Sequence, residues 1–394
     1  MIERMLDHVA ALPQDLRQIC ESLLYIEAAT GQAIPPAAME QWVIRQFGAA
    51  AAVREQTIVT VTNRLTLESA LFNPLRARRP TQPGGGDAAL EKWIARELAE
   101  HDIFADPERD TTADVFGRIR GRYCVSASNV AKYAGWHGLI IFDEPHPLRF
   151  GPAQVRDYLD VALRWIAAAH ALDSHAIYPI ITWNCLPKSG ATIMHGHMQV
   201  ALARGMHYAR VEGWRRAAQA YRATSGRDYF GDLAALHQAL GLAIPLGGAA
   251  RAFAHLTPAR NREIVLLADQ GLRQGDKEIR RPGDACALSP GLLISLSERL
   301  GPALYAVLRR LIDEQGMRAF NLAIALPPIG PAAEDWRDVP IVARLGDRGS
   351  PLTSRSDIGA MEIFAAGCIT DDPFEVAARF HTRDTKTRRQ RDEA

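Results

Sequence analysis

The chain lacks the features of a membrane-spanning, secreted or disulfide-linked protein. Its 394 residues include five cysteines, odd in number, scattered and without a C-x-x-C pair, a usage typical of reduced thiols in the cytoplasm. The longest apolar runs fall far short of the roughly 20 residues of a membrane helix. Residues 1–20 show no basic start followed by an apolar core, so we expect no secretory signal and a cytoplasmic protein.

The chain also lacks an excess of either charge. Lys and Arg number 46 and Asp and Glu number 45, which gives a formal net charge of +1. Because no overall field would attract nucleic acid or an anionic membrane, we expect neither as a partner. The hydrophobic fraction of 47% is that of an ordinary globular protein with one large or two medium domains.

The two ends of the chain differ from its middle. Residues 1–56 carry apolar side chains at helical spacing, interrupted by Pro35 and Pro36. This pattern predicts a helical N-terminal extension, which we interpret as a packing or dimerisation element. The charged segment 382–394 has no apolar anchors and is expected to be a disordered tail.

Between the ends, short alternating β-branched runs flank long amphipathic segments. The order strand, strand, long helix, strand occurs near 122–199 and again near 252–326, which predicts an internal duplication. We therefore predict an α+β fold of two repeats, over 57–243 and 244–381. Each repeat would be a mostly antiparallel sheet with packed helices.

The most informative segment is His195-Gly196-His197-Met198-Gln199. Because side chains alternate along a strand, His195, His197 and Gln199 would line one face of it. Two imidazoles and a carboxamide would then converge on one small volume. Taken alone, two histidines at this spacing are also typical of a solvated face or a metal-binding pair.

The residues around the histidines favour phosphate chemistry. A neutral imidazole is a good nucleophile toward phosphorus, and a covalent intermediate splits one displacement into two easier ones, so we interpret His197 as the nucleophile. Gln199 would donate its amide N–H to a non-bridging oxygen. The preceding turn offers backbone N–H groups, a hydroxyl and a cation, which are groups that hold phosphate. Its candidate ligands are Lys188, Ser189, Gly190 and Thr192.

Asn184, the Ser-Gly-Ala-Thr run at 189–192 and the His195-x-His197-x-Gln199 spacing resemble the signature of the nucleotidyltransferase branch of the histidine triad superfamily. Its relevant families are galactose-1-phosphate uridylyltransferase and diadenosine tetraphosphate phosphorylase (ATP adenylyltransferase). The triad hydrolases typically have a third histidine in place of Gln199, so the resemblance favours transfer over hydrolysis. It implies that His195 orients the nucleophile and that Asn184 fixes the loop or a phosphate.

Two further segments resemble the uridylyltransferases. Residues 73–80 are similar to their arginine-bearing N-terminal segment, where the arginines corresponding to Arg76 and Arg79 contact substrate phosphate; guanidinium groups suit a diphosphate. The alternative is a basic surface loop. Gly359-Ala-Met-Glu362 resembles a stretch whose glutamate binds sugar hydroxyls, so Glu362 is a candidate substrate ligand or else an exposed strand residue.

Another segment resembles the phosphorylases instead. There, an asparagine-bearing loop precedes a histidine and an apolar strand, as Asn129 precedes His137 here. We interpret Asn129 as a candidate nucleotide contact and His137 as structural. The two resemblances point to different substrates, so uridine and adenosine nucleotides both stay open.

The chain departs from the uridylyltransferases at a metal site. Many of them bind structural zinc through a C-x-x-C and two histidines. His146 and His195 stand where those histidines would be, but the chain has no C-x-x-C. Two histidines alone are a poor zinc site, so we predict no tightly bound zinc and no metal ligand. The strand near 321–328 carries no second H-x-H, and Cys368 replaces the usual sugar-contacting glutamine, which argues against an ordinary hexose-1-phosphate acceptor.

These inferences predict an enzyme that moves UMP or AMP from a nucleotide or nucleotide sugar to a phosphorylated acceptor. The transfer would pass through a nucleotidyl group on His197, with ping-pong kinetics. The alternatives are a diadenosine polyphosphate phosphorylase, a nucleotide hydrolase of the same superfamily, and a degenerate nucleotide-binding protein. The resemblance also implies a homodimer.

Overall fold

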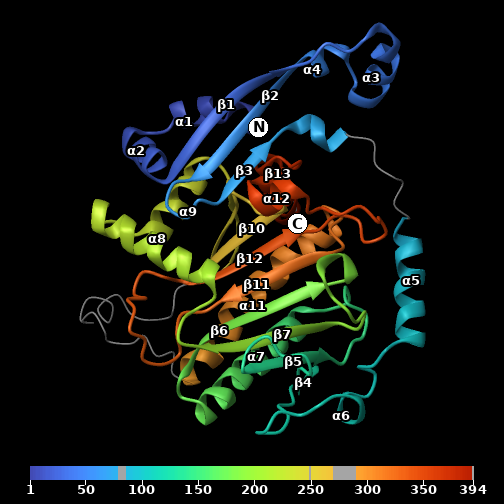
Figure 1. The fold of residues 1–394 in the computed structure, drawn as a ribbon, viewed down its shortest axis with the longest axis vertical. Coiled ribbons are helices and arrows are strands. Elements are labelled where there is room, and N and C mark those ends of the chain that lie inside the picture. The colour runs from blue at the N-terminus through green and yellow to red at the C-terminus, as the bar shows by residue number, and fades with distance from the viewer. Residues whose placement is uncertain (79–85, 248–249, 269–289, 393–394) are drawn as a thin grey trace.

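Two β-sheets organise the chain in a computed structural model that describes residues 1–78, 86–247, 250–268 and 290–392 (Figure 1). The large sheet consists, in spatial order, of β4 (Cys124–Ser128), β5 (Trp136–Phe142), β7 (His197–Arg204), β6 (Ala176–Cys185), β11 (Phe320–Ala325), β12 (Ile341–Asp347), β10 (Asn261–Ala268), β9 (Ala250–Ala254) and β8 (Ala243–Ile244). The small sheet consists of β1 (Leu24–Gln32), β2 (Glu55–Asn63), β3 (Ser69–Phe72) and β13 (Gly367–Ile369).

Two long helices, α7 (Pro152–Leu172) and α11 (Pro290–Asp313), pack side by side against the large sheet. The other helices are α1 (Met5–Ala10), α2 (Gln14–Leu23), α3 (Glu40–Phe47), α4 (Ala50–Arg54), α5 (Asp87–Glu100), α6 (Pro107–Asp110), α8 (Ala209–Ser225), α9 (Tyr229–Ala239), α12 (Ala360–Phe364) and α13 (Pro373–Asp392). Short 3-10 turns are η1 (Ile2–Arg4), η2 (Ala37–Met39), η3 (Pro74–Arg78) and η4 (Pro187–Ser189).

The large sheet contains the predicted duplication. Strands β4, β5, β7 and β6 follow one another on one side, and β9, β10, β12 and β11 follow in the mirrored order on the other. Each set holds its long helix at the same place in the chain, α7 or α11, between its second and third strands. The sets meet where β6 pairs antiparallel with β11, with Asn184 opposite Asn321. The α+β fold of two antiparallel repeats is therefore confirmed.

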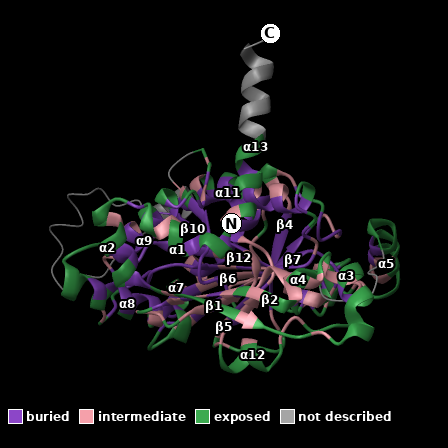
Figure 2. Ribbon diagram, turned by 90° about the horizontal axis from the view of Figure 1, so that it is seen from above, coloured by how far each residue is buried: buried purple, intermediate pink, exposed green. Residues whose placement is uncertain are grey.

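Alternation along the central strands separates a core face from an accessible face. On β6, Ile181 and Trp183 are buried while Thr182 and Asn184 are partly exposed. Figure 2 shows buried residues concentrated in the strands and on the inward sides of the helices. The Phe142 ring stacks on Tyr158 of α7 at 3.7 Å between centroids, which anchors the helix layer on the core face. The opposite face is where polar side chains of the strands collect.

The N-terminal segment differs in part from the expectation. Helices α1 and α2 form as predicted, but residues 24–32, whose apolar spacing we interpreted as a continued helix, form β1. β1 pairs along its whole length with β2, from Leu24 opposite Asn63 to Gln32 opposite Glu55. The conformation of residues 24–32 is decided by pairing with a strand about thirty residues away, and local apolar spacing carries no information about that partner. The boundaries at 56, 243 and 381 stay predictions.

The C-terminal part of the chain is helical where composition indicated a tail. The helix α13 includes most of residues 382–394.

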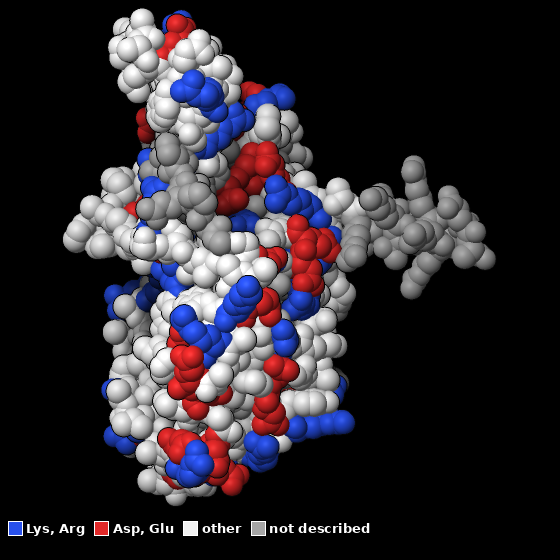
Figure 3. Space-filling model, turned by 90° about the vertical axis from the view of Figure 1, so that its right-hand side faces the viewer, with Lys and Arg blue, Asp and Glu red and all other residues white. Residues whose placement is uncertain are grey.

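None of the helices in the described ranges is long and apolar enough to cross a membrane. On the side of the molecule shown in Figure 3, basic and acidic side chains are interspersed. That face therefore carries no large field of one sign.

Candidate active site

His197 is the first residue of β7, opposite Ile141 of β5. Its ring is buried, at 6% exposure, and Nδ1 lies 2.8 Å from the backbone oxygen of His195. Since a carbonyl oxygen only accepts, Nδ1 carries the proton and the lone pair of the neutral ring is on Nε2. Within the described part of the chain nothing hydrogen-bonds Nε2. Burial, aided by the charge of His195, lowers the pKa of His197 below its usual 6.5, which keeps the ring neutral at physiological pH.

His195 lies just before β7, so only His197 and Gln199 of the predicted trio are within the strand. The Phe104 ring nevertheless packs nearly perpendicular to both imidazoles, with centroids 5.9 Å from His195 and 5.2 Å from His197. The His195 ring is held at both nitrogens: Nδ1 meets the Asp102 carboxylate at 2.8 Å, and Nε2 meets the Phe142 carbonyl oxygen at 2.7 Å. The first histidine of the motif is thus an internal anchor.

The glycine between the two histidines is required by packing. A Cβ atom on Gly196 would lie 2.7 Å from Cδ2 of the Phe142 ring, closer than any real contact. The backbone there is also tied to neighbouring chain, since Gly196 N–H donates to Pro145 and its oxygen accepts from Phe142 N–H. The motif therefore brings its two imidazoles together on a backbone that no larger residue would fit.

Gln199 is oriented by a residue that the sequence led us to interpret as structural. His137 Nε2 lies 3.0 Å from Gln199 Oε1, and Nδ1 of the same ring accepts the Tyr133 N–H at 3.4 Å. With Nδ1 accepting, Nε2 carries the proton and donates to the Gln199 oxygen. The NH₂ group of Gln199 is then the end left for a ligand. Asn129 lies beside this pair, with Nδ2 3.3 Å from His137 Nε2; because both nitrogens carry protons in this tautomer, the contact is not a hydrogen bond.

The predicted phosphate turn is the 3-10 turn η4 and the residues after it. Leu186 and Gly190 both have positive φ, of 71° and 92°, and glycine adopts this conformation without strain. The Ser189 hydroxyl donates to the Leu186 carbonyl oxygen at 2.7 Å, so in this arrangement it closes the turn. Thr192 is exposed, and Lys188 Nζ donates to the backbone oxygen of Arg355.

The second repeat supports this turn through side chains that sequence reasoning missed. Asn321 Nδ2 donates to Asn184 Oδ1 at 2.7 Å and to the Ser189 carbonyl oxygen at 2.8 Å. Arg348 donates to Asn321 Oδ1 at 2.7 Å and pairs with both oxygens of Asp357. Asn184, predicted to fix the loop, is therefore part of a network that joins the two halves of the sheet. No local sequence motif indicates the role of Asn321, which is 137 residues from Asn184.

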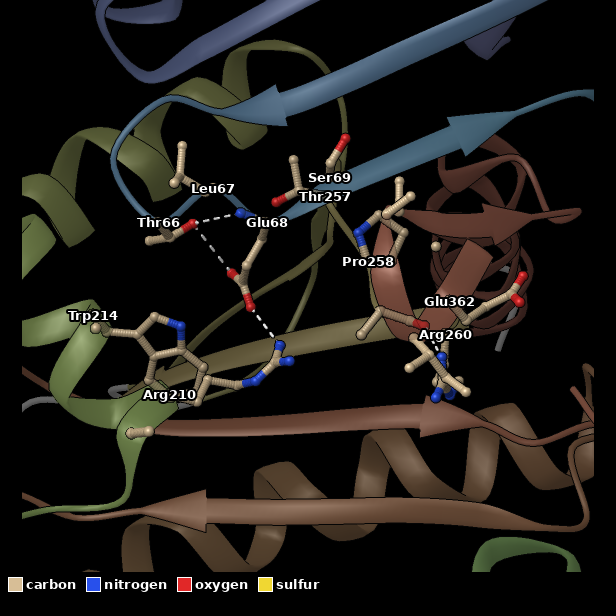
Figure 4. Close-up of a pocket in the computed structure, with 17 residues that line it drawn as sticks. Thr66, Leu67, Glu68, Ser69, Arg210, Trp214, Thr257, Pro258, Arg260 and Glu362 are labelled. Carbon is tan, nitrogen blue, oxygen red and sulfur yellow. Dashed lines mark hydrogen bonds and ion pairs between the residues drawn. The ribbon is translucent and has the colours of Figure 1, made fainter. Parts of the chain in front are cut away.

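The remaining candidates lie elsewhere. Glu362 is on α12 and its carboxylate accepts the Gly359 N–H at 2.8 Å, so it is a helix-capping residue and not a strand residue. It lines a cleft of about 620 Å³ together with Glu68, Arg210 and Trp214 (Figure 4). In that cleft Arg210 pairs with Glu68 at 2.7 Å.

The two candidate arginines come from the N-terminal part of the chain. Arg76 lies in η3 and is partly buried. Arg79 lies outside the described residues. Both stay predictions as phosphate ligands.

The zinc set of the uridylyltransferases does not fit the residues present. His195 uses both ring nitrogens, and His146 accepts the Leu148 N–H at Nδ1 and places Nε2 3.3 Å from Glu91. Nowhere in residues 1–78, 86–247, 250–268 or 290–392 do three His, Cys, Asp or Glu side chains form a group that could hold a metal ion.

Comparison with known proteins gives a likeness in structure but not in sequence. No protein-family model matches the chain, and no curated protein matches it. An ADP-glucose phosphorylase of Arabidopsis thaliana, solved with bound ADP-glucose, superimposes with a TM-score of 0.60 at 14% identity, covering 82% of this chain and 97% of that one. A GalT-like protein of the same plant gives 0.56 at 15% identity, covering 72% and 92%.

A uridylyltransferase gives a TM-score of 0.51 at 15% identity, covering 68% of this chain and 86% of that one. These matches span most of each chain, so the likeness extends to both repeats. The chain therefore has the fold of the uridylyltransferases and of ADP-glucose phosphorylase, as its resemblance to the histidine triad nucleotidyltransferases predicts.

Proposed function

We propose that the chain is a nucleotidyltransferase that uses His197 as its nucleophile. The observation that carries this proposal is the geometry of the His197 ring, which is buried and has Nδ1 2.8 Å from the His195 carbonyl oxygen. Its Nε2 lone pair is thereby set for attack. The Gln199 amide, fixed by His137, and the turn after Leu186 supply donors beside it.

In the first step, the Nε2 lone pair forms a bond to the α-phosphorus of a nucleotide or nucleotide sugar. The bond from that phosphorus to the bridging oxygen breaks, and its electron pair leaves with the phosphate or sugar phosphate. The His197 ring becomes cationic and keeps its Nδ1 proton on the His195 carbonyl oxygen. The Gln199 NH₂ group would donate to a non-bridging oxygen as its negative charge grows.

In the second step, an oxygen of a phosphorylated acceptor attacks the same phosphorus. The N–P bond breaks and returns its electron pair to Nε2, which restores the neutral ring. One product leaves before the acceptor binds, so the kinetics would be ping-pong. A nucleoside diphosphate sugar as donor, with UMP or AMP as the group transferred, agrees with the ligand of the phosphorylase that shares this fold.

Two other activities differ only in the acceptor. Inorganic phosphate in that role would make the chain a phosphorylase, and water would make it a hydrolase. A degenerate nucleotide-binding protein is the non-enzymatic alternative, since the second repeat has no histidine pair at the equivalent strand. We also propose that the enzyme is a homodimer and that it binds no structural zinc ion.

The direct test offers the protein a panel of α-³²P-labelled donors: UDP-glucose, ADP-glucose, ATP and diadenosine tetraphosphate. We expect acid-labile, base-stable label on the protein with at least one donor, and its release as a new nucleotide when phosphate or a sugar phosphate is added. Release into water alone would identify the hydrolase. Binding of every donor without labelling would favour the degenerate protein and overturn the proposal.

Replacing His137 with alanine should lower kcat about 10- to 100-fold with little change in KM, because the Gln199 amide would lose the donor that orients it. Steady-state kinetics with the active donor measure this. The control is a double-mutant cycle: once Gln199 is also alanine, His137→Ala should cost nothing further. Equal losses in both backgrounds would show that His137 does not act through Gln199.

A further inference from the structure

The charged pair behind the nucleophile is the feature that the proposed mechanism leaves unexplained. The side chains of Asp102 and His195 are 8% and 5% exposed, and His195 Nδ1 lies 3.0 and 2.8 Å from the two carboxylate oxygens. Taking charge out of water is costly unless the charge is paired and hydrogen-bonded. Such a pair so close to His197 is therefore a feature that needs a role.

The hydrogen bonds around the His195 ring indicate its protonation. Nδ1 faces a carboxylate and Nε2 faces the Phe142 carbonyl oxygen at 2.7 Å. Both partners are acceptors, and only a ring with a proton on each nitrogen satisfies both. The Asp102 carboxylate supplies the balancing charge, so the two side chains form a neutral buried ion pair.

We propose that this ion pair replaces the structural metal of related enzymes, with Asp102 as the residue that positions the nucleophile through His195. Where a uridylyltransferase would hold a metal on this histidine, Asp102 holds both the ring and the backbone attached to it. That backbone carries the carbonyl oxygen that receives the Nδ1 proton of His197, at 2.8 Å. The orientation of the nucleophile thus depends on a carboxylate 93 residues away from His195 in the chain.

The segment after α5 positions the Asp102 carboxylate. Asp102 Oδ1 also accepts the Phe104 N–H at 2.9 Å, which closes a tight turn. The turn places the Phe104 ring against Val125 and Ile141 of the sheet, at 5% exposure, and nearly perpendicular to both histidine rings. One short segment therefore fixes His195 by charge and covers His197 with an apolar ring.

Among the described residues, His197 is a titratable group that the charge of His195 affects, since burial and that charge both lower the pKa of His197. His197 comes from β7, and the Phe104 ring packs against both His195 and His197. A second histidine–carboxylate pair consists of Glu91 on α5 and His146 on the loop after β5, at 3.3 Å. The Glu91 side chain in this second pair is 49% exposed. Glu91 therefore offers a matched control, as a carboxylate that pairs with a histidine but is not buried.

The test compares Asp102→Asn, which removes only the charge, with Asp102→Glu and with the control Glu91→Gln, in the full-length protein. Ring nitrogen NMR of ¹⁵N-histidine protein, with His195→Gln to assign the signal, should show two protonated nitrogens on His195 in the wild type and one in Asp102→Asn. This readout is independent of any activity, so it tests the ion pair even if the proposed function fails.

The effect on transfer rests on the proposed function. Asp102→Asn should lower the rate of label uptake about 10- to 100-fold with little change in donor binding, Asp102→Glu should restore part of it, and Glu91→Gln should leave it unchanged. Metal analysis should find no stoichiometric metal, and exhaustive chelation should leave Tm and label uptake unchanged. A neutral His195 in the wild type, unchanged labelling in Asp102→Asn, or one tightly bound zinc per chain would each overturn the proposal.

Discussion

Replacing His197 with alanine is expected to lower nucleotidyl transfer by at least about 10⁴-fold, since the residue forms and breaks the only covalent bond between protein and substrate in the proposed mechanism. The variant should take up no label from any donor. It should still bind donor with a Kd within a few fold of the wild type, because the Gln199 amide and the turn after Leu186 are held by other residues. Single-turnover labelling and equilibrium binding, measured side by side, separate the two effects.

A surface histidine gives the matched control. His101→Ala removes an imidazole from the end of α5 that is 66% exposed and, among the described residues, pairs with Glu97. It should leave labelling unchanged. If His197→Ala retained transfer above one per cent of the wild-type rate, or if label persisted on it, the assignment of the nucleophile would be wrong.

The folded chain is expected to lose much of its stability between about pH 6.5 and pH 4. Burial lowers the pKa of His207 and of His237 from 6.5 to about 4, and lowers that of His255 well below 6.5. Below about pH 6.5 these histidines bind protons in the unfolded chain but not in the folded chain. The free energy of unfolding therefore decreases as the pH is lowered, until the folded rings also become protonated. For His207 and His237 the loss is on the order of 3 kcal/mol each.

Carboxylates modify this slope in both directions. The pKa of Asp232 is lowered by its bonds to Arg227 and Tyr221 despite burial, so it also loses stabilisation in acid. Burial raises the pKa of Asp228 and Asp347, and these two act in the opposite direction. The histidines dominate because three of them shift far in the same sense.

Urea unfolding at a series of pH values measures the slope directly. We expect the free energy of unfolding to be nearly constant above about pH 7 and to fall steeply below about pH 6. His207→Gln should reduce by about one the number of protons taken up on unfolding, and so make the pH dependence less steep, since it removes a buried imidazole that stays unprotonated in the folded chain. A free energy of unfolding that stayed constant down to about pH 4.5 would show that these rings are protonated in the folded state.

The sequence predicted those parts of the site that are close together in the chain. The alternation over β6 and β7 and the spacing of His197 and Gln199 give the strand and the shared face correctly, because strand geometry is local. The same local reading failed over residues 24–32, where pairing with β2 overrides a helical spacing. It also placed His195 inside the strand, which begins only at His197.

The groups that hold the site in place come from distant segments. Asp102 reaches His195 across 93 residues, and Asn321 reaches Asn184 across 137. Neither belongs to a motif, and an isolated aspartate after a helix or an asparagine at the start of a strand is ordinary in any sequence. Their roles depend on which elements the fold brings side by side, and only the assembled sheet determines that.

The most direct test of His197 as the nucleophile is the intact mass of the protein, quenched in base after brief exposure to the active donor without acceptor. We predict a gain equal to one nucleoside monophosphate per chain, located by peptide mapping to the segment that contains His197 and reversed when acceptor is added. Transfer to acceptor that proceeded at full rate with no such adduct, or an adduct on any other residue, would contradict it.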